Sequence, residues 1–513
     1  MRRKIGFLLL AVAAASGLGM WWIAGRQRPD VDDAIEMSRP PRISPDYWGI
    51  VLPPNIAPLN FAIREEGRRF WVRISSETRD PIEILSDSPE IAVPPRPWRR
   101  LLEASRGRPL QAEVFVQTDD RWQRFQTLTS RVAEEDIDGW LVYRRVGPIH
   151  NFWRRTDVYQ RDLAGFKTSA VLQSDSIRHG CINCHSFPAN DPGRMLIGLR
   201  SHTLGRGTLL ADGDTAVKLQ TPFGYTAWHP SGRIAAYSVN KVRQFFHAAG
   251  PEVRDVIDVD ASLAYFCVDA RRSKNVPRAA DGNRLATYPG WSPDGRYLYY
   301  SSAPFLWTDR NASPPERYAE VKYDLMRIRY DIDSDRWGEP ETVLASAKTG
   351  LSILMPRISP DGKLLLFCMC RYGCFPAYQP TSDLYLMRLP EGTYEKLPIN
   401  SEFSEAYHSW SSNSRWIAFS SKRQGGFLTR CYLSYVDETG RAHKPFVLPQ
   451  KDPTFYESFL ENICVPELVT GPVGVRESTL ARAARSRDAL PVDAPDGESL
   501  KGEALEAWLQ SGR

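Results

Sequence analysis

The segment Gly290-Trp-Ser-Pro-Asp-Gly-Arg-Tyr-Leu-Tyr-Tyr-Ser301 places a tight-turn sequence between apolar residues. Proline fixes one backbone dihedral of a turn, and glycine accepts the positive φ that a turn often needs. The aromatic and apolar residues that follow fit a pleated strand. The segment therefore predicts a β-hairpin.

The same pattern occurs three more times, and in the last copy Ser-Asn-Ser replaces Pro-Asp-Gly. The copies are Ala227–Ser238, Arg357–Cys368 and Ser409–Ser420. A further strand is predicted after two of the hairpins, at Tyr323–Arg329 and Ser382–Leu389. The repeats are about 50 to 70 residues apart, more than the ~40–50 residues of a compact propeller blade. Repeated small antiparallel sheets predict a β-propeller over 213–470, with five or six blades and long loops.

A second motif, Cys181-Ile-Asn-Cys-His185, precedes these repeats. Two cysteines and a histidine at this spacing are typical of covalent attachment of a c-type haem. Cys181 and Cys184 would bond the haem, and His185 would be the proximal iron ligand. A zinc site needs two more ligands nearby, but the next cysteine is Cys267. A redox dithiol usually belongs to a strand–helix fold, so one covalent haem c is the favoured cofactor.

The motif fixes only one axial ligand of the iron. Met195 is the first candidate for the sixth position, because a thioether ligand would raise the reduction potential. The alternatives are His179, His202 and His247, or an open position that could bind small molecules. The haem-attachment segment, 166–212, is expected to contain some helix. It is too short to enclose a porphyrin, so other walls would come from neighbouring domains, with Phe187, Phe223 and Phe245 as packing candidates.

The start of the chain resembles an export signal. Arg2, Arg3 and Lys4 precede an apolar run over 5–25, which at 1.5 Å per residue can just span a bilayer. The basic flank predicts that the body of the chain faces outward, in the periplasm. Residues 1–30 are thus expected to be an inner-membrane anchor, with a cleaved signal peptide as the alternative.

Two further regions flank the motif and the repeats. Residues 45–165 contain short apolar strands between proline and glycine, which predicts a β-sandwich-like domain. Residues 471–513, rich in alanine, arginine and acidic residues, are expected to be a mobile tail. The predicted fold is therefore all-β: a β-sandwich-like domain, a haem segment and a propeller.

Composition limits the remaining possibilities. A net charge of +5 over 513 residues gives no case for binding nucleic acid. No serine-nucleophile, phosphate-loop or zinc-protease motif is present. Six cysteines outside the haem motif allow either disulfides or a group of buried thiols. They are Cys267, Cys368, Cys370, Cys374, Cys431 and Cys464.

The repeats resemble those of TolB-type propellers. The wider arrangement resembles a group of exported bacterial propeller proteins with one haem-attachment motif ahead of the blades. The matching stretches, between about residues 45 and 470, are Asn55–Phe61, Cys181–Phe187, Asp191-Pro192, Trp228–Gly232, Tyr407–Trp416 and His443–Pro449. The resemblance implies export, a propeller and covalent haem, and it implies no settled activity. The six additional cysteines are a departure from the group.

Three functions are compatible with these features. The first is electron transfer or redox sensing by a membrane-tethered protein whose propeller docks a redox or binding partner. The second is a TolB-like binding scaffold with a structural haem. The third is a haem-dependent oxidoreductase, which would need an open iron position. We expect the first, and favour a role without catalysis over a haem-dependent enzyme.

Overall fold

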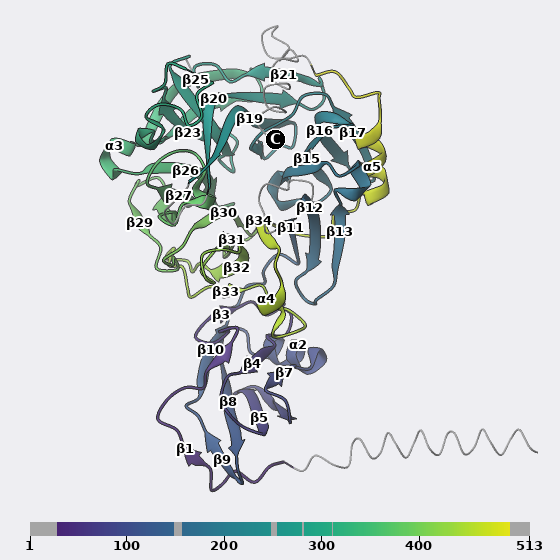
Figure 1. Ribbon diagram of the computed structural model, residues 1–513, viewed down its shortest axis with the longest axis vertical. Helices are drawn as coiled ribbons and strands as arrows, with labels where there is room; N and C mark the ends of the chain where they lie inside the picture. Colours follow the sequence, from purple (N-terminus) through teal and green to yellow (C-terminus); the bar gives the residue numbers. More distant parts are fainter. Residues whose placement is uncertain (1–27, 148–155, 248–253, 280–281, 310, 493–513) are drawn as a thin grey trace, which may run out of the picture. The chain divides into compact units, whose positions relative to one another are not determined.

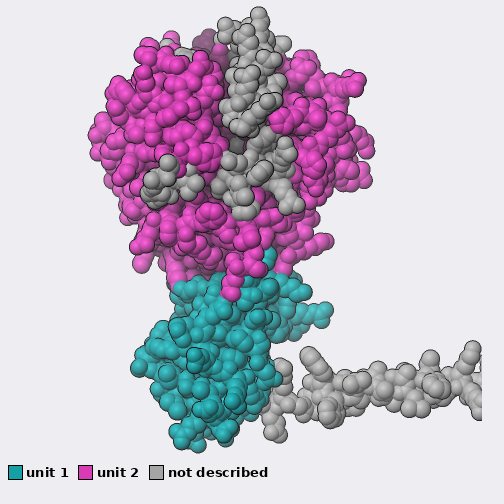
Figure 2. All heavy atoms as spheres, viewed as in Figure 1, with its two compact units in different colours: residues 1–49, 58–132, 450–455 teal, residues 50–57, 133–449, 456–513 magenta. Residues whose placement is uncertain are grey.

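The computed structural model describes residues 28–147, 156–247, 254–279, 282–309 and 311–492. The predicted anchor or signal peptide over 1–30 lies almost wholly outside these residues. Within the described ranges, no helix is both long and apolar enough to cross a bilayer. The chain divides into two compact units, coloured separately in Figure 2: residues 1–49, 58–132 and 450–455, and residues 50–57, 133–449 and 456–513.

Unit 1 is built from strands and one helix. Strands β1, β9, β8 and β10 lie in this order in one sheet, with β5 between β8 and β6, and β2, β4 and β7 form a second sheet. Helix α2 (Pro95–Ala104) buries Trp98, Leu101 and Leu102 along one face. The strands are β1 (Ile35–Glu36), β2 (Ile43–Ser44), β4 (Phe61–Ile63), β5 (Arg69–Ser76), β6 (Arg79–Ser86), β7 (Glu90–Ile91), β8 (Pro109–Thr118), β9 (Arg121–Arg124) and β10 (Leu128–Val132).

The predicted β-sandwich-like range of 45–165 divides between the two units. Its second part, from residue 133, belongs to unit 2. A distant segment, 450–455, joins unit 1 instead. The amide of Asn60 fixes this segment by donating hydrogen bonds to the carbonyls of Gln450 (3.2 Å) and Lys451 (2.8 Å).

Unit 2 contains four separate four-stranded antiparallel sheets, one for each sequence repeat. In each, consecutive strands are neighbours, as in a propeller blade. The strands of these sheets are β18 (Thr226–Trp228), β19 (Ile234–Phe246), β20 (Arg254–Cys267) and β21 (Arg272–Asn275); β22 (Arg284–Trp291), β23 (Tyr297–Pro304), β24 (Asp324–Asp331) and β25 (Arg336–Leu344); β26 (Ser352–Ile358), β27 (Leu364–Cys370), β28 (Asp383–Arg388) and β29 (Tyr394–Lys396); β30 (Glu405–Trp410), β31 (Trp416–Ser421), β32 (Arg430–Tyr435) and β33 (Phe446–Val447).

The predicted hairpins are confirmed, because each turn motif joins the first and second strands of a sheet. In the second repeat, Gly295 has φ 72°, and its N–H donates to the carbonyl of Ser292 (2.9 Å). The carboxylate of Asp294 accepts from the N–H of Arg296 (3.0 Å). In the fourth repeat, Ser414 takes the glycine position with φ 63°. The turn conformation is therefore kept where the glycine is lost.

An eight-stranded sheet completes unit 2. Its order is β17-β16-β15-β14-β12-β11-β34, with β13 also paired to β12. Strands β12 and β14 meet through a single parallel pair, Thr156 and Cys181, so the sheet consists of two four-stranded halves. The strands are β11 (Trp140–Val146), β12 (Thr156–Asp162), β13 (Thr168–Leu172), β14 (Cys181–Ser186), β15 (Arg194–Ser201), β16 (Gly205–Asp212), β17 (Thr215–Leu219) and β34 (Asn462–Val469).

The sheets of unit 2 follow one another around a ring (Figure 1). The ring is closed by β34, which comes after the last repeat and pairs antiparallel with β11, which precedes the first. This pairing of a late strand with an early one closes the ring of sheets. The fold of unit 2 is a β-propeller.

Two expectations about the flanking segments need correction. The segment 166–212 contains two 3₁₀ turns, η1 (Asp175–Ile177) and η2 (Pro188–Asn190), instead of α-helix, and its strands belong to the propeller. The predicted mobile tail is wrong for residues 471–492. Helix α5 (Glu477–Arg485) buries Leu480, Ala481 and Ala484 in the same apolar cluster as strands of the eight-stranded sheet, because small alanines allow close packing.

Candidate functional site

The haem motif forms most of β14, the strand through which the two halves of the eight-stranded sheet are joined. It pairs antiparallel with β15, and the register breaks between Asn183 and His185. Such a break inserts an extra residue into one strand and redirects the side chains beyond it. Cys184 is therefore the bulged residue of β14, and its side chain lies outside the described part of the structure.

His185 is buried, with 2% of its surface exposed. Its Nε2 lies 3.3 Å from the carbonyl oxygen of Val142 in β11. Its Nδ1 is buried and has no hydrogen-bond partner among the described residues. Burial lowers the pKa of His185 to about 3, so the imidazole is neutral at physiological pH, which is the form that binds metals.

Cys181 and His185 lie on opposite faces of the sheet. Cross-strand partners in an antiparallel pair share a face, and alternate residues of one strand share a face. Ile182 pairs with Leu199, and His185 pairs with Ile197, which places Ile182 and His185 on one side. Cys181 pairs with Arg200 on the other side. Its thiol lies 3.4 Å from Oδ1 of Asn183.

The motif therefore fits a c-type haem in the kind of donors it offers, but not in their present arrangement. A free thiol and a neutral imidazole with an unpartnered nitrogen are the required groups. Because they face opposite sides of β14, the two side chains cannot reach one porphyrin until the chain turns between them. The bulge at Cys184 is where the strand is already irregular.

His185 also lines a cavity formed by the innermost strands of the propeller. The lining residues come from β14, β22, β26, β30 and β34 and from the start of β18. The cavity volume is about 60 Å³, enough for a few water molecules and well below the ~300–1,000 Å³ of typical small-molecule sites.

Four residues that line the cavity have a backbone conformation that is rare outside glycine. Tyr288, Met355, Tyr407 and Val465 have φ values of 52°, 58°, 47° and 52°. In β22, β26 and β30, each lies within the register break of its strand. Positive φ costs about 1–3 kcal/mol at each such residue and is often concentrated at functional sites. The repeated strain points to a functional cavity.

The cavity is lined by one half-buried ion pair and by two neutral histidines. Arg357 donates to the carboxylate of Glu467 (2.7 Å), and burial raises the pKa of Glu467 despite this arginine. His408 is held by the carbonyl of Leu366 (Nε2, 3.1 Å) and by the thiol of Cys368 (Nδ1, 3.6 Å). Burial lowers the pKa of His408 to about 3. His185, unlike His408, therefore keeps a nitrogen without a partner.

The candidate sixth ligands lie apart from one another. Met195 is buried in the apolar cluster that also includes Ile182 and residues of α5. His179 is on the surface, paired with Asp175, and His202 is exposed. His247 lies 3.4 Å from the carboxylate of Asp255. None of these four lines the cavity, and Met195 stays a prediction.

The aromatic residues expected around the haem are also dispersed. Phe187 is the nearest, with its ring 6.1 Å from that of His185. Phe223 stacks on Tyr237, and Phe245 contacts Tyr318.

The seven cysteines whose side chains are described are all free thiols. Six of them are buried, and Cys267 is half-buried. Burial raises the pKa of Cys368, Cys370 and Cys374, which makes them unreactive as nucleophiles. Across the described ranges, no group of three or more cysteine, histidine or acidic side chains is arranged to hold a metal ion.

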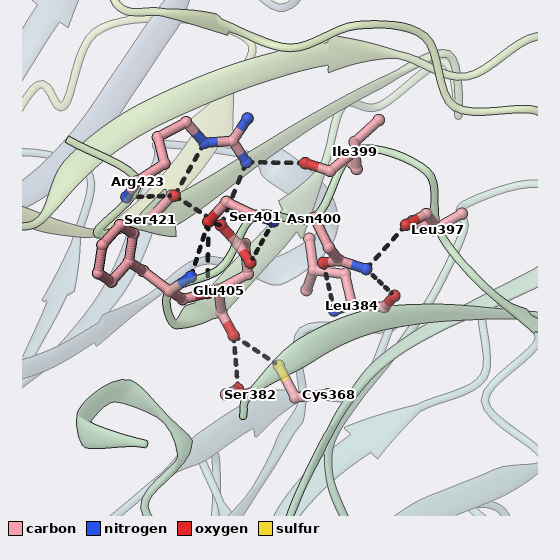
Figure 3. A network of polar contacts seen from close by, with 11 residues as sticks. Cys368, Ser382, Leu384, Leu397, Ile399, Asn400, Ser401, Glu405, Ser421 and Arg423 are labelled. Carbon is pink, nitrogen blue, oxygen red and sulfur yellow. Dashed lines mark hydrogen bonds and ion pairs between the residues drawn. The ribbon is translucent and has the colours of Figure 1, made fainter. Parts of the chain in front are cut away.

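The Cys368 region contains a buried polar network instead (Figure 3). Glu405 is fully buried, and its carboxylate accepts from the hydroxyls of Ser401 and Ser421 (2.7 Å each) and from Arg423 (3.2 Å). The carbonyl of Glu405 accepts from Ser382 (2.7 Å). The network connects β30, the first strand of the fourth repeat sheet, to the segments that contain Ser382, Ser401 and Arg423. Its role is structural.

The sequence reading missed the cavity residues, although the repeats contain a signal for them. Tyr225, Tyr288, Met355 and Tyr407 each stand three positions before the anchor residue of a repeat. The anchors are Trp228, Trp291, Ile358 and Trp410. A large side chain at one fixed offset from every anchor would have identified this ring of residues.

Comparison with known proteins gives no family. No family model matches the chain, and no curated protein matches it. Among solved structures, it is similar to the tricorn protease (10% identity, 64% of this chain and 35% of that chain, TM-score 0.28), the Dos1 propeller (11%, 53% and 63%, 0.30) and oligogalacturonate lyase from Vibrio parahaemolyticus (10%, 59% and 92%, 0.32). The chain spans about a third of the tricorn chain. Because these TM-scores are low, the assignment of a propeller fold is based on the strand pairing described above.

Proposed function

We propose that this chain is an exported c-type cytochrome that combines one covalent haem with a six-bladed, TolB-type propeller and transfers electrons. Cys181 and Cys184 would hold the haem, and His185 would bind its iron. The observation that carries the proposal is the state of His185: a buried, neutral imidazole with an unpartnered nitrogen, within the attachment motif and beside the central cavity. Bound haem would supply one-electron exchange.

The chain's own residues contribute in three ways. Burial keeps His185 unprotonated and therefore able to bind a metal. The carbonyl of Val142 orients the imidazole through its Nε2. The six four-stranded groups of unit 2, including the two halves of the eight-stranded sheet, give a rigid ring on which a redox partner would dock. Export through residues 5–25, a periplasmic location and Met195 as sixth ligand remain parts of the proposal.

Haem attachment requires a local change in β14. Cys181 and His185 must come to one side of the chain, so the residues around Cys184 would leave their pairing with β15. The register is already broken there.

The test is the visible spectrum of the full chain, made in a host competent for haem attachment and measured after denaturation. Haem that stays with the denatured wild type but not with Cys184→Ala would support the covalent site. Cys267→Ala, which removes a half-buried thiol outside the motif, is the matched control and should keep its haem. Wild type without haem after denaturation would refute the proposal.

A second candidate function is a binding scaffold, favoured by the strained cavity. The Cys181→Ala/Cys184→Ala variant distinguishes this function from electron transfer. If this variant folds and keeps every binding activity of the wild type, the haem is structural. If the loaded iron binds carbon monoxide, its sixth position is open and an oxidoreductase becomes the better interpretation.

A further inference from the structure

The strand that closes the propeller, β34, carries a cysteine and packs against the start of β32, which carries another. Cys464 is 7% exposed, and Cys431 is fully buried. The backbone of β34 meets the chain just before β32, where the N–H of Ile463 donates to the carbonyl of Thr429 (3.0 Å). The amide oxygen of Asn462 accepts from the N–H of Thr429 (2.8 Å). The two segments are therefore direct neighbours at this point.

A second contact fixes β34 on the other side of Cys464. The N–H of Val465 donates to the hydroxyl of Ser420 in β31 (3.2 Å). Ser420 is the antiparallel cross-strand partner of Cys431, and the side chains of such partners share one face of the sheet. Because the hydroxyl of Ser420 reaches β34, the thiol of Cys431 lies on the face that β34 crosses.

The side chain of Cys464 is directed toward the same sheet. Alternate residues of a strand share a face, and Asn462, two residues before Cys464, directs its side chain to Thr429. Between its contacts with Thr429 and Ser420, β34 passes Cys431, which is two residues after the first and paired with the second. A disulfide needs Cα atoms within about 7 Å, a separation that residues on neighbouring strands provide.

The electrostatic coupling of the two thiols agrees with this placement. Burial raises the pKa of Cys431, Arg161 opposes the shift, and Cys464 adds to it. An effect of one thiol on another requires a short separation, because the interaction falls with distance. The thiol of Cys431 is also weakly held: its hydrogen bond to the carbonyl of Tyr432 is 4.0 Å long, against 3.5 Å for that of Cys374.

We propose that Cys431 and Cys464 form a disulfide when the chain meets a disulfide oxidant, and that this bond fastens β34 to β32. Cys464, the more exposed thiol, attacks the oxidant as its thiolate and releases one thiol from it. Cys431 then loses its proton and attacks the mixed disulfide, which releases the second thiol. Two protein thiols and one disulfide thus become one protein disulfide and two thiols. In the cell the step rests on the proposed export, because disulfides persist in oxidising compartments.

The experiment is oxidation of the full chain, purified in the reduced form, in a mixture of reduced and oxidised glutathione. Urea near the unfolding midpoint lets β34 open, and it is removed before the remaining thiols are alkylated. Trypsin then releases each of the two cysteines in a peptide of its own, 431–441 and 452–476. The variants are Cys431→Ala and, as the matched control, Cys267→Ala, which removes a half-buried thiol from the first repeat sheet.

The wild type and Cys267→Ala should both yield these peptides as a cross-linked pair. The urea midpoint of the wild type should rise on oxidation, because a disulfide restricts the unfolded chain, and Cys431→Ala should lose this gain. Recovery of Cys431 and Cys464 as alkylated thiols or glutathione adducts, or cross-linked to other cysteines, would overturn the proposal. Failure of export or of haem attachment would leave the result unchanged, since oxidation is carried out on the purified chain.

Discussion

Replacing Asp258 by asparagine should stabilise the protein at neutral pH and change how its stability depends on pH. Asp258, in β20, is 1% exposed, and its carboxylate oxygens make no hydrogen bond of normal geometry among the described residues, although the side chains of Asn240 and Cys374 lie close enough to favour the charged form. Burial raises its pKa from 3.8 to about 7. Asn240 lies beside it, with a buried amide oxygen that also lacks a described partner. The new amide could donate to that oxygen.

The direction of the effect follows from proton linkage. Between about pH 4 and pH 7 the folded protein holds a proton on Asp258 that the unfolded chain has released. The free energy of unfolding therefore falls as pH rises through this window. A difference of about 3 pKa units corresponds to about 4 kcal/mol at pH 8, as an upper estimate. The nearby charge of Asp260 adds to the raised pKa.

The assay is urea unfolding of wild type and Asp258→Asn at pH 4.5, 6 and 8. The stability difference between the two should be small at pH 4.5 and should favour the variant by about 2–4 kcal/mol at pH 8. Asp269→Asn, which removes an exposed carboxylate just after the same strand, should follow the wild type at every pH. Parallel pH profiles for wild type and Asp258→Asn would refute this reasoning.

Two further predictions concern other parts of the chain. Glu405→Gln should lower the free energy of unfolding by about 3 kcal/mol, because it breaks a buried ion pair. The exposed Glu341→Gln, measured by the same urea titration, should cost under about 1 kcal/mol. Leu480→Ala, in α5, should lower the free energy of unfolding by about 2–5 kcal/mol, and an unchanged urea midpoint would mean that the helix is not part of the core.

The propeller was predictable because its repeats contain local information. The residues of a turn such as that around Gly295 specify its backbone dihedrals locally. The apolar and aromatic residues after the turn indicate a strand without reference to the rest of the chain. Even the degenerate copy could be aligned, since Ser414 keeps the spacing of the other repeats. The boundaries of the first domain could not be predicted in the same way. Pairing of β34 with β11 joins residues more than 300 positions apart, and no local pattern reports it.

The local sequence also could not predict which secondary-structure element contains the haem motif. Its residues were recognised by spacing, but Cys181 and His185 read equally well as part of a helix or a strand. Their assignment to β14 depends on β15, through contacts that the motif does not encode. The tail was misread for a different reason. A composition rich in alanine, arginine and acidic residues is typical of a mobile tail, although the small size of Ala481 and Ala484 suits burial.

The closure of the ring has a consequence for the order of events during synthesis. The motif in β14 emerges from the ribosome long before β34, because about 280 residues separate them. At about 5–20 residues per second, this interval is on the order of 15–60 seconds. During that time β11 lacks its final partner, so the blade next to Cys181 and His185 is incomplete. A modification that needs access to these side chains has its opportunity then, before the last strand seals the ring.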